Sequence, residues 1–184
     1  MAAIQTIEQI PYGQVRDTCI FGKHKVNNEE AWEIPWTIVH RDRSKRLLTL
    51  FADNIIDLRA FDAIEPSNSD SNRQKYGNNR YRYSNIRKWL NSSAGSWYTA
   101  QHSADAPPNT TASVGNAGTQ YQSRPGFLYH FSTQERALLG VSSVVVNLAS
   151  VDGGTTETLE DTVFLPTYKE LGGSGGADVG ETFE

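Results

Sequence analysis

The chain of 184 residues contains a single cysteine, Cys19. One thiol cannot build an intrachain disulfide, a thiolate zinc cluster or an iron–sulfur site, so these features are excluded. No redox or metal-binding motif surrounds Cys19, and we expect it to be an ordinary buried or half-buried thiol.

Long apolar runs are also absent from the sequence. No stretch approaches the ~18 consecutive apolar residues that a membrane-spanning helix needs. Residues 1–10 lack both a basic start and an apolar stretch, so no signal peptide is expected. We therefore expect the protein to be made in a cytoplasm, with cell lysis as its possible route of release.

Neither sign of charge is in large excess. The 17 Lys and Arg residues against 21 Asp and Glu residues give a net charge of −4, which argues against a dedicated nucleic-acid-binding protein. Hydrophobic residues make up 38% of the chain, enough to form a core and to exclude wholesale disorder. We expect one globular domain over residues 1–172 and a flexible glycine-rich tail over residues 173–184.

Several short strands are predicted by β-branched and large apolar residues. Residues 34–40 and 46–51 have the pattern of a hairpin whose polar turn spans residues 41–45. The other expected strands lie around residues 15–21, over 141–148 and over 161–165.

Two short helices are predicted from their first residues. Ser84 is a suitable N-cap, and residues 86–90 place apolar side chains, Trp89 among them, on one stripe. Ser132 and Glu135 have the spacing of a capping box, and the helix that follows is expected to end at the next glycine.

The segments 62–82 and 93–126 show little periodicity but contain aromatic residues, which indicates loops packed on a scaffold. The expected class is therefore α+β, with a small antiparallel sheet, two short helices and long packed loops. An exposed aromatic ring in such a loop can stack on a sugar, whereas a buried one anchors the loop. The aromatic residues considered for a ligand site are Tyr76, Tyr81, Trp97, Tyr98 and Tyr121.

Six basic residues and no acidic residue lie between positions 73 and 88, with three tyrosines interleaved. This pattern is typical of surfaces that stack bases and neutralise phosphates. Alternatively, the acid-rich region 150–184 pairs with this segment within the chain or across a subunit contact. The basic residues are Arg73, Lys75, Arg80, Arg82, Arg87 and Lys88.

No motif indicates a catalytic or metal centre. The four histidines show no helical metal-ligand spacing. Residues 102–105 (His-Ser-Ala-Asp) hold the residue types of a hydrolytic triad, but contiguous loop residues rarely converge as one, so we expect a turn. The oxygen-rich residues 68–72 lack the glycine and distal glutamate of a helix–loop–helix calcium site and can instead bond their own backbone. We expect no metal and no cofactor.

Several motifs of the loops and the first helix are distinctive. They lie at residues 58–63, 65–73, 76–81, 83–92, 97–98, 102–105, 126–128 and 161–165. Together they resemble an uncharacterised domain family of tailed bacteriophages, prophages and some bacterial surface proteins. The resemblance covers roughly residues 10–172.

This resemblance implies a C-type-lectin-like or formylglycine-generating-enzyme-like fold. It implies no catalytic residue, because the chemistry of that enzyme class depends on two cysteines and this chain has one. Relatives usually continue beyond the segment 161–165 into a Trp-Trp-Leu-Arg segment that this sequence lacks. A sheet edge is therefore expected to be open near Val145 or Val163.

From these features we expect a non-enzymatic virion protein of a bacteriophage, on the tail, the baseplate or the head surface. Its expected partners are other virion proteins, further copies of itself in a homo-oligomer, and a host-surface glycan, with no membrane. Region 150–184 of one copy would face segment 73–88 of the next. The alternative is an intracellular nucleic-acid-binding protein that uses segment 73–88. A third hypothesis, a hydrolase of cell-wall sugars, requires two close carboxylates.

Overall fold

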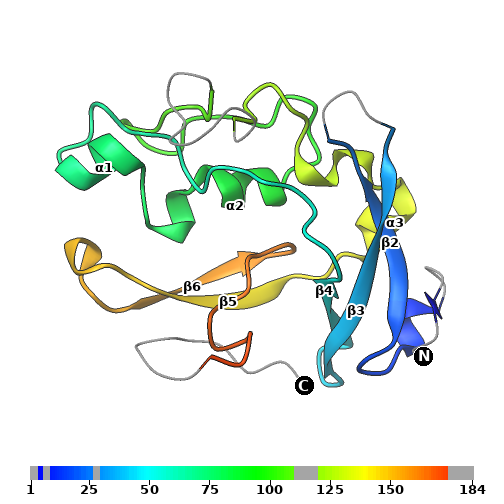
Figure 1. The fold of residues 1–184 in the computed structure, drawn as a ribbon. Helices are drawn as coiled ribbons and strands as arrows, with labels where there is room; N and C mark the ends of the chain where they lie inside the picture. Colours follow the sequence, from blue (N-terminus) through cyan, green and yellow to red (C-terminus); the bar gives the residue numbers. More distant parts are fainter. Residues whose placement is uncertain (1–3, 6–8, 27–29, 110–119, 174–184) are drawn as a thin grey trace.

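The computed structural model describes residues 4–5, 9–26, 30–109 and 120–173 (Figure 1). A four-stranded sheet at one side of the molecule has the order β1-β2-β3-β4. Strand β1 (Ile4–Gln5) runs parallel to β2 (Thr18–His24), whereas β2, β3 (Trp32–Asp42) and β4 (Leu47–Ala52) are antiparallel. The predicted hairpin and the predicted early strand are thus confirmed, the latter three residues later than expected at each end.

A second, two-stranded antiparallel sheet consists of β5 (Ser142–Asn147) and β6 (Thr156–Asp161), joined through the short helix η4 (Ser150–Asp152). The strand predicted over residues 141–148 is confirmed as β5. The strand predicted over residues 161–165 is wrong, because β6 ends at its first residue.

The side chain of Asn91 explains this end of β6. Its Oδ1 accepts hydrogen bonds from the backbone N of Thr162 (2.9 Å) and of Val163 (3.1 Å), and its Nδ2 donates to the Val163 carbonyl (2.8 Å). A side chain thus occupies the backbone groups that a neighbouring strand would use. The open edge expected near Val163 is therefore closed within the chain. For β5, which contains Val145, no second strand partner is found among the described residues.

Both predicted helices are present. Helix α2 (Asn85–Leu90) begins after Ser84, whose side chain accepts a hydrogen bond from the backbone of Arg87, and α3 (Thr133–Leu138) begins with the predicted capping box. Helix α1 (Ser71–Tyr76) was not predicted and begins after the N-cap Asp70. The remaining short helical turns are η1 (Ile10–Tyr12), η2 (Tyr81–Tyr83) and η3 (Phe127–His130).

Long loops with α1 and α2 cover the second sheet and flank the first, as Figure 1 shows. We name residues 60–109 and 120–131 the loop layer. Two small, mainly antiparallel sheets with a few short helices confirm the α+β class. No helix formed by the described residues has the length and apolar character needed to cross a membrane. Of the tail predicted over residues 173–184, only Gly173 lies within the described residues.

The core between the loop layer and the sheets is aromatic. The rings of Trp89, Tyr121 and Phe127 pack with centroids 5.5 Å apart in each pair that includes Trp89. Burial of these aromatic side chains supplies most of the stability of a domain with so little helix and strand. Cys19 is buried in the same core, and burial raises the pKa of its thiol to about 11, so it is an inert thiol as expected.

A bulge in β2 joins the first sheet to α3. Gly22 has a φ of +74°, and a Cβ at this position would lie 2.2 Å from the ring of Phe131. The backbone N of Gly22 donates a 2.7 Å hydrogen bond to Oε1 of Glu135. Glycine therefore supplies both the left-handed conformation and the space that brings the helix against the strand.

Candidate functional site

The loop layer is built around the buried carboxylate of Asp62. Its Oδ2 accepts a 2.6 Å hydrogen bond from the backbone N of Asn78, and its Oδ1 accepts a 3.0 Å bond from that of Asn85. The Asn85 side chain in turn accepts from the backbone N of Ala63 and donates to Asp105. Side-chain bonds to backbone groups thus replace the missing strands and helices in holding these loops.

Three ligand-type side chains converge beside this network. Glu65, His102 and Asp105 each offer an oxygen or nitrogen atom, and these atoms all lie within 4.8 Å of one another. Nε2 of His102 lies 2.9 Å from Oε1 of Glu65, yet neither atom makes a well-aligned hydrogen bond. Glu65 is fully buried at 0% exposure, whereas the His102 side chain is 24% exposed and reaches the surface.

Negative charge accumulates at this place. Burial, together with the charges of Asp105, Asp62 and Glu65, raises the pKa of the Tyr98 hydroxyl to about 12. Burial also raises the pKa of Asp62 to about 7, despite the two hydrogen bonds that favour its charged form. Desolvation outweighs those bonds because the carboxylate is almost completely removed from water.

The prediction of a turn at residues 102–105 is confirmed, since the backbone N of Asp105 donates a 3.2 Å hydrogen bond to the carbonyl of His102. The same turn places the two side chains toward Glu65, which the local sequence did not indicate. Glu65 is 37 positions away from His102, so spacing along the chain held no signal of this cluster.

The oxygen-rich residues 68–72 form hydrogen bonds to their own backbone, which was the predicted alternative to a calcium site. Oδ1 of Asn68 accepts from the backbone N of Asp70, and Oδ1 of Asp70 accepts from those of Asn72 and Arg73. Asp70 thereby becomes the N-cap of α1. The Asn68 amide also donates to Oε2 of Glu65 and so orients that carboxylate.

A second histidine–carboxylate pair lies deeper in the molecule. Nε2 of His24 lies 2.8 Å from Oδ2 of Asp57, and the same oxygen lies 2.6 Å from Nη2 of Arg59. All three side chains are at least 92% buried, and aromatic rings surround the imidazole. This triplet links β2 to the segment before the loop layer and is closed to a substrate.

Three of the five aromatic residues considered for a ligand site are buried. Tyr121 is 0% exposed, Trp97 2% and Tyr81 9%, so these three rings follow the second alternative, a buried loop anchor, and are not accessible to a ligand. Trp97 stacks on Tyr121 and donates from its Nε1 to the Tyr121 carbonyl, and the Tyr121 hydroxyl donates to the carbonyl of Ala60. These residues anchor loops. Tyr76 is 57% exposed and Tyr98 is half-buried, so both retain accessible ring surface.

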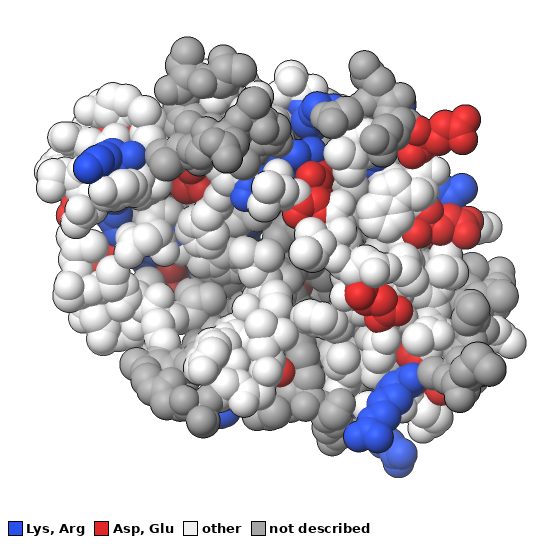
Figure 2. All heavy atoms as spheres, in the orientation of Figure 1, with Lys and Arg blue, Asp and Glu red and all other residues white. Residues whose placement is uncertain are grey.

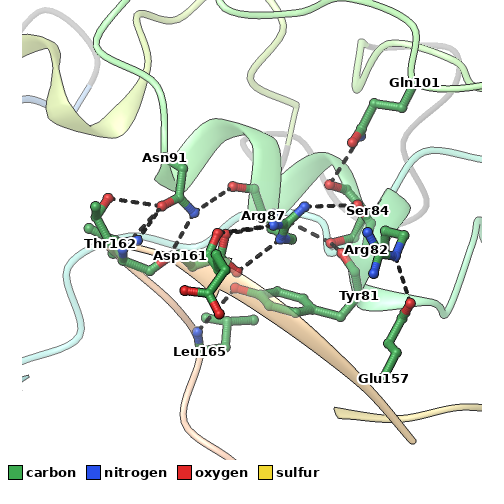
Figure 3. A network of polar contacts seen from close by, with 12 residues as sticks. Tyr81, Arg82, Ser84, Arg87, Asn91, Gln101, Glu157, Asp161, Thr162 and Leu165 are labelled. Atoms are coloured by element: carbon green, nitrogen blue, oxygen red, sulfur yellow. Dashed lines mark hydrogen bonds and ion pairs between the residues drawn. The ribbon is translucent and has the colours of Figure 1, made fainter. Parts of the chain in front are cut away.

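The four arginines of the basic segment 73–88 pair with acids of the same chain. Arg73 pairs with Asp152, and Arg80 and Arg82 share Glu157. Figure 3 shows the contact of Arg82 with Glu157 and the two-point contact of Arg87 with Asp161. Figure 2 accordingly shows acidic and basic side chains interspersed on the face it presents.

These contacts support pairing within the chain, one of the two alternatives for the acid-rich region 150–184. Asp152, Glu157 and Asp161 pair with arginines of the same chain, and pairing between copies stays a prediction. Four of the six basic residues that suggested nucleic-acid binding are therefore already paired with acids of the same chain. Among the described residues, no carboxylate forms an ion pair with Lys75 or Lys88, and the Lys75 ammonium lies over the ring of Tyr76.

Replacing Glu157 with glutamine should lower the free energy of unfolding by about 1–3 kcal/mol, because two guanidinium groups lose their shared carboxylate. Urea titration at pH 7 measures this loss. The two arginines lower the pKa of Glu157, so its contribution is present above the ordinary value of 4.5 and is lost as the pH falls through the lowered pKa.

The matched control is Glu160→Gln on the same strand. The exposed Glu160 carboxylate accepts a hydrogen bond from the Ser143 hydroxyl and pairs with no arginine of the described residues. Arg87 contacts only the backbone carbonyl of Glu160, which the substitution retains. Its substitution should change the stability by less than about 0.5 kcal/mol. Equal losses in the two variants would contradict the role given to Glu157.

An apolar cavity of about 270 Å³ lies between β4, the segment that connects α3 to β5, and residues 162–166. Its lining includes Trp36, Leu48, Phe131 and Phe164. Such a lining buries apolar surface but contributes few polar groups that would select a ligand. The polar cluster of the loop layer is therefore the better candidate for a functional site.

Comparison with known proteins gives one finding. The domain of unknown function DUF6273 matches residues 47–183 of the chain. The matched range begins at β4 and contains the whole loop layer, including Glu65, His102 and Asp105. No curated protein and no solved structure matches the chain.

Proposed function

The chain belongs to the DUF6273 family, and we propose that it is a non-enzymatic bacteriophage virion protein whose loop layer binds another virion protein or a host-surface glycan. The motifs of residues 58–105, which resemble phage and prophage proteins, support the virion assignment. As part of the same proposal, the fold is related to the C-type-lectin-like class, in which small antiparallel sheets carry long packed loops.

The observation that carries the proposal is the fixed loop layer. Its loops are held by buried side-chain bonds to backbone groups, centred on Asp62, Asn85 and Tyr121. A binding surface made of loops gains affinity when the loops are already ordered before the ligand arrives. Most of the buried polar side chains among the described residues belong to the loop layer, which supports a role of this layer in display and binding.

Tyr98 marks the part of this surface best suited to a sugar. Its ring packs edge-on against Trp97, with centroids 5.9 Å apart, and its hydroxyl feels the charge of the half-buried Asp105 carboxylate. The ring face would then pack on the C–H groups of a sugar, and the adjacent carboxylate oxygens would accept hydrogen bonds from its hydroxyl groups.

The hydrolase hypothesis is less well supported by this geometry. Ligand atoms of Glu65 and Asp105 lie within 4.8 Å, close to the separation of the carboxyl groups in retaining glycosidases, about 5–5.5 Å. Glu65 is, however, fully buried and cannot reach the glycosidic bond of a bound polysaccharide. Release of reducing sugar from host cell walls would overturn the non-enzymatic proposal.

In a glycan array prepared from host cell walls, Tyr98→Ala should bind at least about tenfold more weakly than the wild type, because one stacked ring is lost. Tyr168→Ala is the matched control, since Tyr168 is an exposed tyrosine outside the loop layer. Equal binding by the two variants would exclude Tyr98 as a sugar contact.

Mass spectrometry of purified virions tests the location independently. The chain should be found in intact particles at a stoichiometry that matches a symmetric tail, baseplate or head substructure. Association through the β5 edge, in a homo-oligomer or with a neighbouring virion protein, belongs to the same proposal. Absence of the chain from intact particles would overturn the virion assignment whatever the glycan array shows.

A further inference from the structure

We propose that Glu65, His102 and Asp105 together bind one divalent transition-metal ion of the Zn²⁺ type. This inference goes beyond the proposed function and does not depend on it. An imidazole nitrogen with two carboxylate oxygens is a mixed donor set that suits Zn²⁺ and its neighbours better than Ca²⁺ or Mg²⁺, which prefer oxygen donors alone.

The distances fit a shared ion. With bonds of about 2.0–2.1 Å and tetrahedral angles, two ligand atoms of one zinc ion lie about 3.3 Å apart. Nε2 of His102 and Oε1 of Glu65 are 2.9 Å apart, and all three ligand atoms lie within 4.8 Å of one another. Small rotations of the partly exposed His102 and Asp105 side chains would close the set around an ion.

The burial of Glu65 is the independent observation that points to a ligand. The side chain is 0% exposed, and none of the described residues donates a hydrogen bond to its Oε1. Within the described part of the chain, Nε2 of His102 likewise makes no hydrogen bond, although it faces this oxygen at 2.9 Å. A buried carboxylate oxygen without a hydrogen bond is costly, and a coordinated cation would remove that cost.

Outer hydrogen bonds hold both carboxylates in place. The Asn68 amide donates to Oε2 of Glu65, which leaves Oε1 directed at the cluster. Oδ1 of Asp105 accepts from the Asn85 side chain at 3.2 Å, and its Oδ2 accepts from the backbone N of Gln101 at 2.7 Å. Because each carboxylate oxygen has two lone pairs, both can still coordinate. Such outer partners orient metal ligands and raise affinity.

The exposed part of His102 provides the entry path. Its Nδ1 accepts only a long hydrogen bond, 3.3 Å, from the backbone N of Ala104, so little is lost when the imidazole turns toward an ion. Three protein ligands leave a coordination position for water or for a donor group of a bound molecule.

Zinc binding to the full chain, without a histidine tag and after treatment with a chelator, tests the proposal. Titration of ZnCl₂ in competition with a chromophoric chelator should give one site per chain. The His102→Ala variant should bind at least about 100-fold more weakly, since a ligand is removed rather than an outer partner. Co²⁺ should give a visible absorption spectrum that the same variant abolishes, and CaCl₂ should not compete.

The matched control is His40→Ala, which removes a half-buried histidine of β3 outside the cluster and should leave zinc binding unchanged. Asp105→Asn is the second variant, and circular dichroism of each protein shows whether it is folded. The proposal is overturned if the wild type binds no zinc, or if His102→Ala and His40→Ala bind it equally. Either result would leave Glu65 and His102 as a histidine–carboxylate contact without a metal.

Discussion

Replacing Trp97 with alanine should lower the free energy of unfolding by about 3–5 kcal/mol. Trp97 is one of the most buried large side chains, and its ring stacks on Tyr121 with centroids 5.2 Å apart and an interplanar angle of 8°. Alanine would leave a cavity at this contact. It would also remove the hydrogen bond from Nε1 to the carbonyl of Tyr121, 3.1 Å long, and leave that oxygen with the 3.0 Å bond from the backbone N of Arg124.

Urea titration followed by circular dichroism measures this loss. Tyr76→Ala serves as the control, because Tyr76 lies in the same layer but is largely exposed, and it should change stability by less than about 0.5 kcal/mol. An unchanged melting temperature for Trp97→Ala, combined with loss of ligand binding, would restore Trp97 as a contact residue and refute its role as an anchor.

Replacing Asp62 with alanine should cost about 2–4 kcal/mol at pH 7, because two buried backbone N–H groups, of Asn78 and Asn85, lose their acceptor. Asp62→Asn retains one acceptor oxygen and presents an amide group to the other N–H, so its loss should be smaller, about 1–2 kcal/mol. A loss for Asp62→Ala no larger than that for Asp62→Asn would contradict the double-acceptor role.

The stability difference between the wild type and Asp62→Asn should depend on pH in a defined direction. Burial raises the pKa of Asp62 from an ordinary value of 3.8 to about 7, so the folded state binds this proton more tightly than the unfolded state. The stability contributed by the group is therefore greatest below pH 3.8, decreases as the pH rises to about 7 and is constant above it. A carboxyl-carbon NMR titration that placed the pKa of Asp62 at or below 3.8 would contradict this account.

Both expected effects reflect how this domain replaces regular structure. Asp62 and Asn91 each satisfy backbone groups that a strand or a helix would otherwise pair, and Asp70 begins a helix of only six residues. Ordering loops costs backbone entropy, and the buried polar bonds with the aromatic packing offset that cost. A surface fixed in this way is suited to binding, which is why the loop layer carries the functional proposal.

Local elements could be predicted because their causes lie within a few residues. The N-cap Ser84, the capping box of Ser132 and Glu135, and the hairpin of β3 and β4 are confirmed, since caps and turn residues act on their immediate neighbours. Helix α1 has the same kind of signal, an N-cap at Asp70 and a glycine after the last turn, but it lies in a segment without an apolar stripe.

Other features could not be predicted because distant residues decide them. Segment 161–165 has β-branched and apolar residues typical of a strand, yet Asn91, 70 or more positions earlier, bonds its backbone and ends β6. The loop aromatics Trp97 and Tyr121 have the composition of a sugar-binding surface, but only packing against the core determines that they are buried.

Patterns along the chain were thus enough to predict the α+β class, the hairpin, the two capped helices and the exclusion of disulfide and cysteine-based metal chemistry. The packing of distant segments determines which arginines pair with which acids, which aromatic rings remain exposed, and that Glu65 lies beside His102 and Asp105. The two sets of features differ in the distance along the chain over which their causes act. Caps, turns and alternation depend on neighbours along the chain, whereas burial, charge pairing and ligand convergence depend on how segments 20 to 80 positions apart pack together.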